Sequence, residues 1–204
     1  MKWFMLAAEH DNSGAQYNLG WMYQNGKGVE KSDEEAAKWY TFAAEKGYDD
    51  AQLKIGIMYK MGEGVEQSDD EAVKWFRLAA DQNIPLAQVA LGSMYEDGKG
   101  VEQSIEEAFK WYKLAAEQGY SIGQLIVGRI YAIGDNVEQS YEEAAKWYKL
   151  ASDQGLDKAQ FNLAELYELG NGVEQSIEEA TRLYQLAANQ GLPEAIEKLS
   201  KVGL

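Results

Sequence analysis

Few side chains of this protein could do covalent or acid–base chemistry. His10 is the only histidine among 204 residues, and the chain has no cysteine. Without a thiol, sulfur-dependent zinc sites are excluded, and a lone histidine leaves no Ser/His/Asp or Cys/His arrangement beyond His10 itself. We interpret His10 as an ordinary surface residue. We therefore expect no enzymatic activity, no catalytic residues, no metal and no cofactor.

The charge and hydropathy of the chain exclude further classes of partner. There are 34 acidic and 19 basic residues, and the formal charge of −15 repels phosphate backbones and anionic lipid surfaces. No apolar stretch approaches the roughly 18 to 20 residues that span a bilayer, and Glu9 and Asp11 soon follow the apolar start. We expect a soluble monomer without signal peptide or membrane insertion, with no nucleic-acid partner and with an unknown location.

A 36-residue period dominates the sequence and shows which elements must position any functional residue. Tryptophan recurs at this interval, and leucine takes the next place: Trp3, Trp39, Trp75, Trp111, Trp147 and Leu183. A loop valine recurs at the same interval: Val29, Val65, Val101, Val137 and Val173. Such regularity indicates a stacked array of similar units rather than an ordinary globule.

Each repeat contains two apolar patterns with helical spacing, which we name helix A and helix B. One face of helix A in the second repeat consists of Ala51, Ile55, Met58 and Tyr59. A wider arc of helix B consists of Ala72, Trp75, Phe76, Leu78, Ala79 and Ala80. This wider arc predicts that helix B contacts both its own partner and the next repeat. No segment is left over for a β-strand.

The ends of helix B are also written in the sequence. It opens with serine followed three residues later by glutamate, a capping box: Ser32/Glu35, Ser68/Glu71, Ser104/Glu107, Ser140/Glu143 and Ser176/Glu179. It ends at residues that tolerate a left-handed conformation: Gly47, Asn83, Gly119, Gly155 and Gly191. Most carboxylates occupy such repeating cap or first-turn positions, and five of them form predicted i,i+4 ion pairs on helix B: Glu34/Lys38, Asp70/Lys74, Glu106/Lys110, Glu142/Lys146 and Glu178/Arg182. These carboxylates are interpreted as structural, not catalytic.

The repeat unit resembles the Sel1-like repeat, a relative of the tetratricopeptide repeat. It reads Ala-Gln-x3-Gly-x2-Tyr-x2-Gly-x-Gly-Val and then Ser-x-x-Glu-Ala-x-Lys-Trp-Tyr-x-Leu-Ala-Ala-x-Gln-Gly. The resemblance covers essentially the whole chain. It implies an all-α fold, a right-handed superhelical α-solenoid of helix-turn-helix repeats, and a role as adaptor or scaffold. Asn136 replaces the second loop glycine in the fourth repeat, and the chain does not resemble the disulfide-linked branch of the family.

We expect one repeat domain over residues 1–204. Its parts are a partial repeat with helix B alone at 1–11, five full repeats at 12–47, 48–83, 84–119, 120–155 and 156–191, and a C-terminal capping helix at 192–204. Glycine inside helix A predicts close packing against helix B, at Gly20, Gly56, Gly92 and Gly128, with Ala164 in the fifth repeat.

Function is sought where the repeats differ from one another. Three columns of helix A lie opposite its core stripe and are expected to line the concave groove of the solenoid. The first column is apolar and has either a packing or a ligand-binding role: Tyr17, Leu53, Val89, Leu125 and Phe161. The second changes in kind at every step: Trp21, Ile57, Ser93, Arg129 and Glu165. The third is interpreted as a solvated rim: Gln24, Lys60, Glu96, Ala132 and Glu168.

The leading hypothesis is a scaffold that binds a peptide or protein segment in this groove. Trp21, Ile57 and Met61 would be apolar anchors, and Arg129 or Glu165 would fix the orientation of the peptide. One alternative is binding of cell-wall glycan or another small ligand, stacked on the aromatic rings of Tyr17, Trp21 and Phe161. The other is a structural or engineered module without a ligand of its own. The sequence does not identify the partner.

Overall fold

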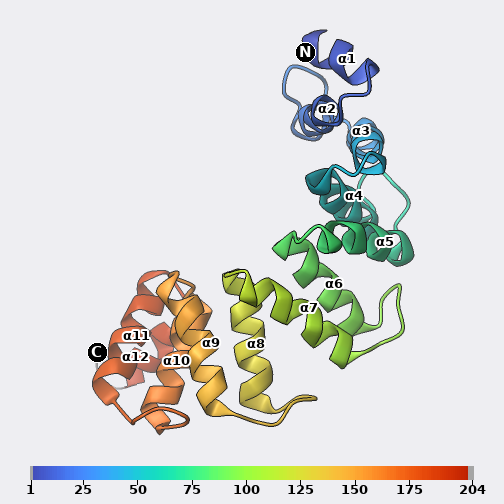
Figure 1. The fold of residues 1–204 in the computed structure, drawn as a ribbon. Helices are drawn as coiled ribbons and strands as arrows, with labels where there is room; N and C mark the ends of the chain where they lie inside the picture. The colour runs from blue at the N-terminus through green and yellow to red at the C-terminus, as the bar shows by residue number, and fades with distance from the viewer. Residues whose placement is uncertain (1, 202–204) are drawn as a thin grey trace. The chain divides into compact units, whose positions relative to one another are not determined.

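The computed structural model describes residues 2–201, and every regular element in that range is an α-helix (Figure 1). Met1 and residues 202–204, which belong to the predicted first and last segments, lie outside the described residues. The A helices are α2 (Ser13–Asn25), α4 (Asp49–Met61), α6 (Pro85–Asp97), α8 (Ser121–Ile133), α10 (Asp157–Leu169) and α12 (Pro193–Lys201). The B helices are α1 (Lys2–Glu9), α3 (Asp33–Glu45), α5 (Asp69–Asp81), α7 (Ile105–Glu117), α9 (Tyr141–Asp153) and α11 (Ile177–Asn189).

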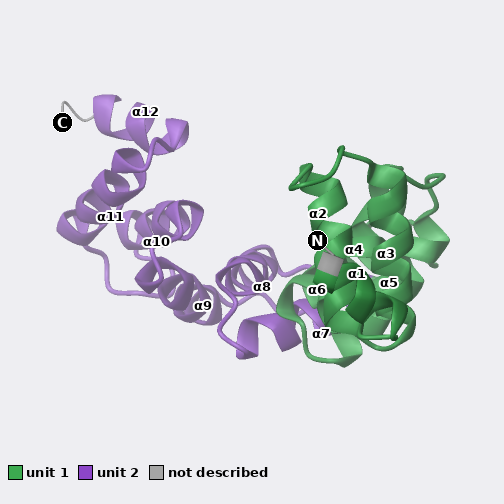
Figure 2. Ribbon diagram, turned by 90° about the horizontal axis from the view of Figure 1, so that it is seen from above, with its two compact units in different colours: residues 1–104 green, residues 105–204 purple. Residues whose placement is uncertain are grey.

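The chain divides into two compact units, unit 1 (Met1–Ser104) and unit 2 (Ile105–Leu204) (Figure 2). In unit 1 each helix from α1 to α6 packs on the next one along the chain, and in unit 2 the helices from α7 to α12 do the same. Each unit is therefore a local stack of helical hairpins. The predicted repeat boundaries and the single repeat domain stay predictions.

The serine caps form as predicted, but the second half of the capping box does not. The hydroxyls of Ser32, Ser68, Ser140 and Ser176 accept the backbone N–H three residues later, at 3.1 to 3.3 Å. The backbone N–H of each serine donates instead to a tyrosine carbonyl of the preceding A helix, for example Ser32 to Tyr23 at 3.1 Å. This bond closes the loop between helices A and B and leaves the cap glutamate available to another partner.

The predicted i,i+4 ion pairs are mostly wrong, because the cap glutamates bind the basic residue at i+3. Four cap glutamates pair at i,i+3 in Glu35–Lys38, Glu71–Lys74, Glu143–Lys146 and Glu179–Arg182. In the third repeat Lys110 contacts both Glu107 at 2.8 Å and the predicted partner Glu106 at 2.9 Å. The carboxylate of the capping box is thus used for an exposed ion pair.

The turn after helix B has the predicted left-handed backbone. Asn83 has a φ of 64°, and the glycine at the same position in the preceding repeat, Gly47, has a φ of 83°. Asn136, the replacement in the fourth Gly-x-Gly-Val loop, also has a positive φ of 54°. Asparagine therefore adopts the left-handed conformation at both places where it replaces glycine in this pattern.

Close packing explains the glycines inside helix A. A Cβ atom on Gly20 would lie 2.6 Å from the ring of Tyr40, and one on Gly56 would lie 2.7 Å from the ring of Phe76. Gly128 meets Tyr148 in the same way, at 2.6 Å. The aromatic side chain of helix B thus fills the space that the glycine leaves on its partner helix, as the sequence predicts.

The exposed side of helix B differs from the prediction. Trp75 is buried with a relative exposure of 7%, as expected for a core position. Leu78, which was predicted to belong to the buried arc, is exposed, and so are its equivalents one repeat apart: Leu6, Phe42, Leu114, Leu150 and Leu186. Because the whole column is exposed, the buried arc of helix B is narrower than its apolar pattern.

Buried glutamines join consecutive B helices within each unit. Gln52, which is 4% exposed, donates to the Ala44 carbonyl at 3.1 Å. Its side-chain oxygen accepts from Gln82 at 2.8 Å, and Gln82 also donates to the Gly47 carbonyl at 3.1 Å. One glutamine amide thus links α4, α5 and the turn after α3. Because all these polar atoms are paired, the joint can be buried at little cost.

Candidate functional site

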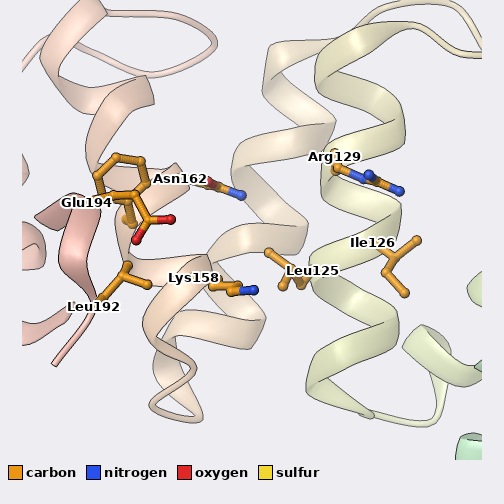
Figure 3. Close-up of a pocket in the computed structure, with 8 residues that line it drawn as sticks. Leu125, Ile126, Arg129, Lys158, Asn162, Leu192 and Glu194 are labelled. Atoms are coloured by element: carbon orange, nitrogen blue, oxygen red, sulfur yellow. The ribbon is translucent and has the colours of Figure 1, made fainter. Parts of the chain in front are cut away.

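A pocket of about 480 Å³ lies in unit 2 over three A helices, α8, α10 and α12 (Figure 3). It is lined by Leu125, Ile126, Arg129, Lys158, Phe161, Asn162, Leu192 and Glu194. Leu125 and Arg129 are one helical turn apart on α8, and Lys158 and Asn162 are one turn apart on α10. The four-residue spacing places each pair on one face of its helix, so the two faces meet at the pocket.

The apolar floor of the pocket is held by core side chains. The ring of Phe161 packs against Tyr184 of α11, with ring centroids 5.4 Å apart and planes at 56°. Leu192, just before α12, is buried. A floor that is fixed by its own packing loses little conformational freedom when an apolar group binds.

Polar groups on either side of this floor are also positioned. Burial raises the pKa of the Tyr148 hydroxyl to about 12, although a hydrogen bond with Asn162 and the charge of Arg129 both lower it. Asn162 and Arg129 are therefore close to a hydroxyl that stays neutral. The side chains of Arg129 and Lys158 are exposed, and Glu194 in the first turn of α12 adds a negative charge at the rim.

A carboxylate cluster lies one turn beyond Asn162 on α10. Burial raises the pKa of Glu165, and Glu168 acts in the same direction, whereas the charge of Lys198 opposes them. Glu168 contacts the Lys198 ammonium at 2.8 Å and accepts a hydrogen bond from Tyr184 at 2.7 Å. These two partners outweigh burial and lower the pKa of Glu168. The carboxylate of Glu168 therefore has its partners within the fold. The carboxylate of Glu165 is half-buried, and burial has the largest effect on its pKa.

Three of the four predicted site residues of unit 2 line the pocket: Leu125, Arg129 and Phe161. Glu165 lies on the next turn of α10 and is not one of the lining residues. The four-residue spacing on α8 and on α10 places each pair of predicted residues on one face of its helix. Whether they bind a ligand stays a prediction.

The predicted site residues of unit 1 have varied surroundings and do not line this pocket. The ring of Tyr17 packs against Tyr40 and Tyr48, with centroids 5.4 and 5.1 Å apart, and Leu53 is buried. These two side chains therefore have a packing role. Trp21 and Met61 are exposed; the remaining predicted residues are partly buried: Ile57, Val89 and Ser93.

The third column is more than a solvated rim. The hydroxyl of Tyr40 donates to Gln24 at 3.0 Å, and Tyr184 donates to Glu168 at the same repeat position. In these two repeats the column supplies the acceptor for the tyrosine hydroxyl of helix B, whereas Tyr148, opposite Ala132, bonds with Asn162 instead. Gln24 and Glu168 are therefore part of the packing between helices A and B.

Sequence reasoning missed five lining residues, Ile126, Lys158, Asn162, Leu192 and Glu194. A signal for two of them was present. One column changes in kind at every step except that from leucine to isoleucine: Gly14, Asp50, Leu86, Ile122, Lys158 and Glu194. The same search for variable positions, extended to the first turn of helix A, would have identified Lys158 and Glu194. Leu192 belongs to the turn before α12 and has no such signal.

The Sel1 repeat family matches five consecutive blocks, residues 13–48, 49–84, 85–120, 121–156 and 157–192. The chain therefore belongs to the Sel1 repeat family. Proteins of this family generally act as protein-interaction scaffolds and are typically non-enzymatic. A search of curated proteins gave no match.

Solved structures agree with this assignment. A protective antigen present in uropathogenic Escherichia coli strains, which displays an SLR fold, is 38% identical with a TM-score of 0.95 over 99% of this chain and 43% of its own. A Sel1 repeat protein from Oxalobacter formigenes is 34% identical with a TM-score of 0.87, covering 94% of this chain and 76% of its own. The chain thus spans less than half the length of the first of these. The predicted fold class, an all-α solenoid of 36-residue repeats, is confirmed.

A more distant structure shares the fold alone. Immunity protein Pa5087 from Pseudomonas aeruginosa is 23% identical with a TM-score of 0.57, over 90% of this chain and 67% of its own.

Within residues 2–201, no helix is long and apolar enough to cross a membrane. The same residues contain no group of three or more His, Asp or Glu side chains arranged to hold a metal ion.

Proposed function

We propose that the protein is an interaction scaffold and that the pocket of unit 2 binds a short peptide segment of a protein partner. An apolar side chain of the peptide enters between Leu125, Phe161 and Leu192. An acidic group lies near Arg129 and Lys158, and a basic or hydrogen-bond-donating group lies near Glu165. The single observation that carries this proposal is the pocket itself, in which an apolar floor is flanked by two cations.

Charge supports this polarity of the ligand. The protein carries a formal charge of −15, but at this pocket two exposed cations, Arg129 and Lys158, outnumber the one lining carboxylate, Glu194. An acidic group is attracted to these two cations, although the net charge of the protein repels it at long range. Charge complementarity of this kind mainly sets orientation and specificity, and burial of the apolar anchor supplies most of the affinity.

The glycan alternative receives less support. Stacking on a sugar needs an aromatic face open to solvent, whereas Tyr17 packs against two tyrosines and Phe161 packs against Tyr184. Of the aromatics named for that alternative, Trp21 is exposed. A peptide with one apolar side chain needs only the floor of the pocket.

The test is selection of a phage-displayed random peptide library on the wild-type protein, followed by anisotropy titration of the selected peptides carrying fluorescein. We expect apolar-plus-acidic peptides whose affinity falls at least about tenfold in Arg129→Glu and in Lys158→Glu. Arg182→Glu is the matched control, because Arg182 is an exposed arginine of unit 2 that pairs with Glu179 outside the pocket. Trp21→Ala reports separately on any contribution of unit 1.

Two results would contradict the proposal. One is the absence of any enriched peptide that binds the purified protein. The other is equal affinity of the selected peptides for wild type, Arg129→Glu and Lys158→Glu. Unfolding curves of all three proteins in urea exclude loss of structure as the cause of weaker binding, since both side chains are exposed.

A further inference from the structure

The glutamine joints within the two units show a repeated hydrogen-bond arrangement. In unit 2, Gln154 donates to the side-chain oxygen of Gln124 at 2.8 Å and to the Gly119 carbonyl at 2.9 Å. Gln190 does the same with Gln160 and Gly155, at 2.9 Å for both contacts. Gln82 in unit 1 makes the same two contacts. Each of these joints therefore holds a primary amide whose two N–H groups donate to one side-chain amide oxygen and one backbone carbonyl.

The first joint of unit 1 has a glutamine oxygen, that of Gln16, but lysine stands where the later joints have the glutamine donor. Gln16 is 3% exposed and donates to the Ala8 carbonyl at 3.3 Å, as Gln52 does to Ala44 one repeat later. That bond identifies its other side-chain atom as the oxygen, which is buried and has no hydrogen-bond partner. Position 46 holds lysine where the later repeats hold Gln82, Gln118, Gln154 and Gln190. The Lys46 ammonium turns instead to the carboxylate of Asp11 at 2.9 Å.

A pocket of about 470 Å³ lies at this joint. Its lining includes Gln16, Lys46 and Asp11, together with the aromatic side chains of Trp39 and Phe42. The two rings meet edge to face, with centroids 5.7 Å apart. An unpaired amide oxygen therefore lies beside aromatic walls, and leaving such an oxygen without a donor is unfavourable.

We propose that this pocket binds the primary amide of a glutamine or asparagine side chain from a partner protein. The amide N–H groups donate to the side-chain oxygen of Gln16 and to the Asp11 carbonyl, the position equivalent to Gly47 in the next joint. The aliphatic part of the side chain packs against Trp39 and Phe42. The bound amide thus takes the place that Gln82 occupies one repeat later.

The later joints indicate a carboxamide rather than a charged group. A carboxylate has no N–H to donate to the oxygen of Gln16, and Glu9, Asp11 and Glu45 line the pocket. The cation already present, the Lys46 ammonium, pairs with Asp11 while the oxygen of Gln16 has no partner. A carboxamide supplies the missing donor as Gln82, Gln154 and Gln190 do in the later joints, and it has apolar atoms for the aromatic walls.

The test uses the peptide acetyl-Ala-Gln-Ala-N-methylamide, whose only primary amide is the side chain, with the Glu and Leu analogues as controls. Binding is followed by NMR from the assigned indole N–H signal of Trp39, which suits weak ligands. We expect a saturable shift with the Gln peptide and at least about tenfold weaker binding of both analogues. Lys46→Gln fills the pocket from within, so it is expected to lose the shift while its thermal unfolding temperature is no lower than that of wild type.

A second variant guards against misfolding as an explanation. Gln82→Lys copies the first joint into the second, and we expect it to gain a saturable shift at Trp75 that wild type lacks. The proposal is overturned if wild type shows no saturable shift at Trp39. It is equally overturned if the Glu or Leu peptide binds as well as the Gln peptide, or if folded Lys46→Gln binds like wild type.

Discussion

Helix α1 and the later B helices carry the same residue types at the same repeat positions, in different surroundings. Trp3 on α1 is 81% exposed, whereas Trp75 on α5 is 7% exposed and belongs to a core cluster with side chains of α3 and α4. Lys46 closes the joint after α1 through an exposed ion pair, whereas Gln82 closes the next one through two amide hydrogen bonds. The repeat position defines what a side chain can contact, and the neighbouring helices decide whether the contact exists.

The largest expected effect is loss of a tryptophan from the core. Trp75→Ala should lower the free energy of unfolding by about 3 to 5 kcal/mol, because it removes a buried indole and leaves a cavity. Trp3→Ala should change it by less than about 0.5 kcal/mol, because the indole of Trp3 is already in water. Urea unfolding of both variants measures the difference. Equal losses would mean that the repeat position, and not its surroundings, sets the contribution.

Smaller effects are expected where a glycine approaches an aromatic ring. Gly56→Ala would place a Cβ atom 2.7 Å from Phe76 and should destabilise by about 1 to 3 kcal/mol. Gly14, in the first turn of α2, has its nearest such neighbour at 3.5 Å. Gly14→Ala should therefore stabilise by about 0.5 to 1 kcal/mol. Thermal unfolding of the two variants should shift in opposite directions, and a shared direction would refute the packing account of the helix A glycines.

The joints themselves give the third comparison. Gln154→Leu removes the hydrogen bonds to Gly119 and Gln124 and leaves the side-chain oxygen of Gln124 without this donor, so a loss of about 1 to 3 kcal/mol is expected. Lys46→Leu breaks an exposed ion pair and should cost less than about 1 kcal/mol. Urea titrations compare the two. If Lys46→Leu proved the more damaging change, the first joint would depend on its ion pair after all.

The last comparison concerns a gain in stability at the first joint. Lys46→Gln supplies the donor that the buried oxygen of Gln16 lacks and should stabilise the protein by about 1 kcal/mol. The gain should disappear in the double variant Lys46→Gln with Gln16→Met, which has no acceptor. A double-mutant cycle on unfolding free energies measures this coupling, and zero coupling would show that the two side chains do not meet.

Most of the fold could be predicted from the sequence because each local signal recurs in successive 36-residue repeats. The serine caps, the left-handed turns and the glycine-to-ring contacts each recur, and each follows from local geometry. The i,i+4 pairing was mostly wrong, because the backbone N–H of Ser32 and its equivalents binds a tyrosine carbonyl and releases the cap glutamate to an i,i+3 lysine. The predicted burial of Leu78 was wrong, because the apolar period does not show where the neighbouring helices stop covering helix B.

The candidate site was predictable in part. Variation in kind at Arg129 and Glu165 identified α8 and α10, since a repeated fold does not need such variety. The contribution of α12 through Leu192 and Glu194 depends on how helices pack, and the sequence does not contain that information. The joint at Lys46 was overlooked because one substitution in a regular column is visible only after the hydrogen bonds of that column are known.

The central claim is that repeated residues build the array and varied residues carry recognition. The most direct measurement is made on the variant Arg129→Ser with Lys158→Asp, which copies Ser93 and Asp50 from the same columns of unit 1. Its urea midpoint and its affinity for peptides selected on wild type are measured together. The account predicts an unchanged midpoint and a loss of affinity of at least about tenfold. Unchanged affinity, or a loss of binding that merely follows a loss of stability, would contradict it.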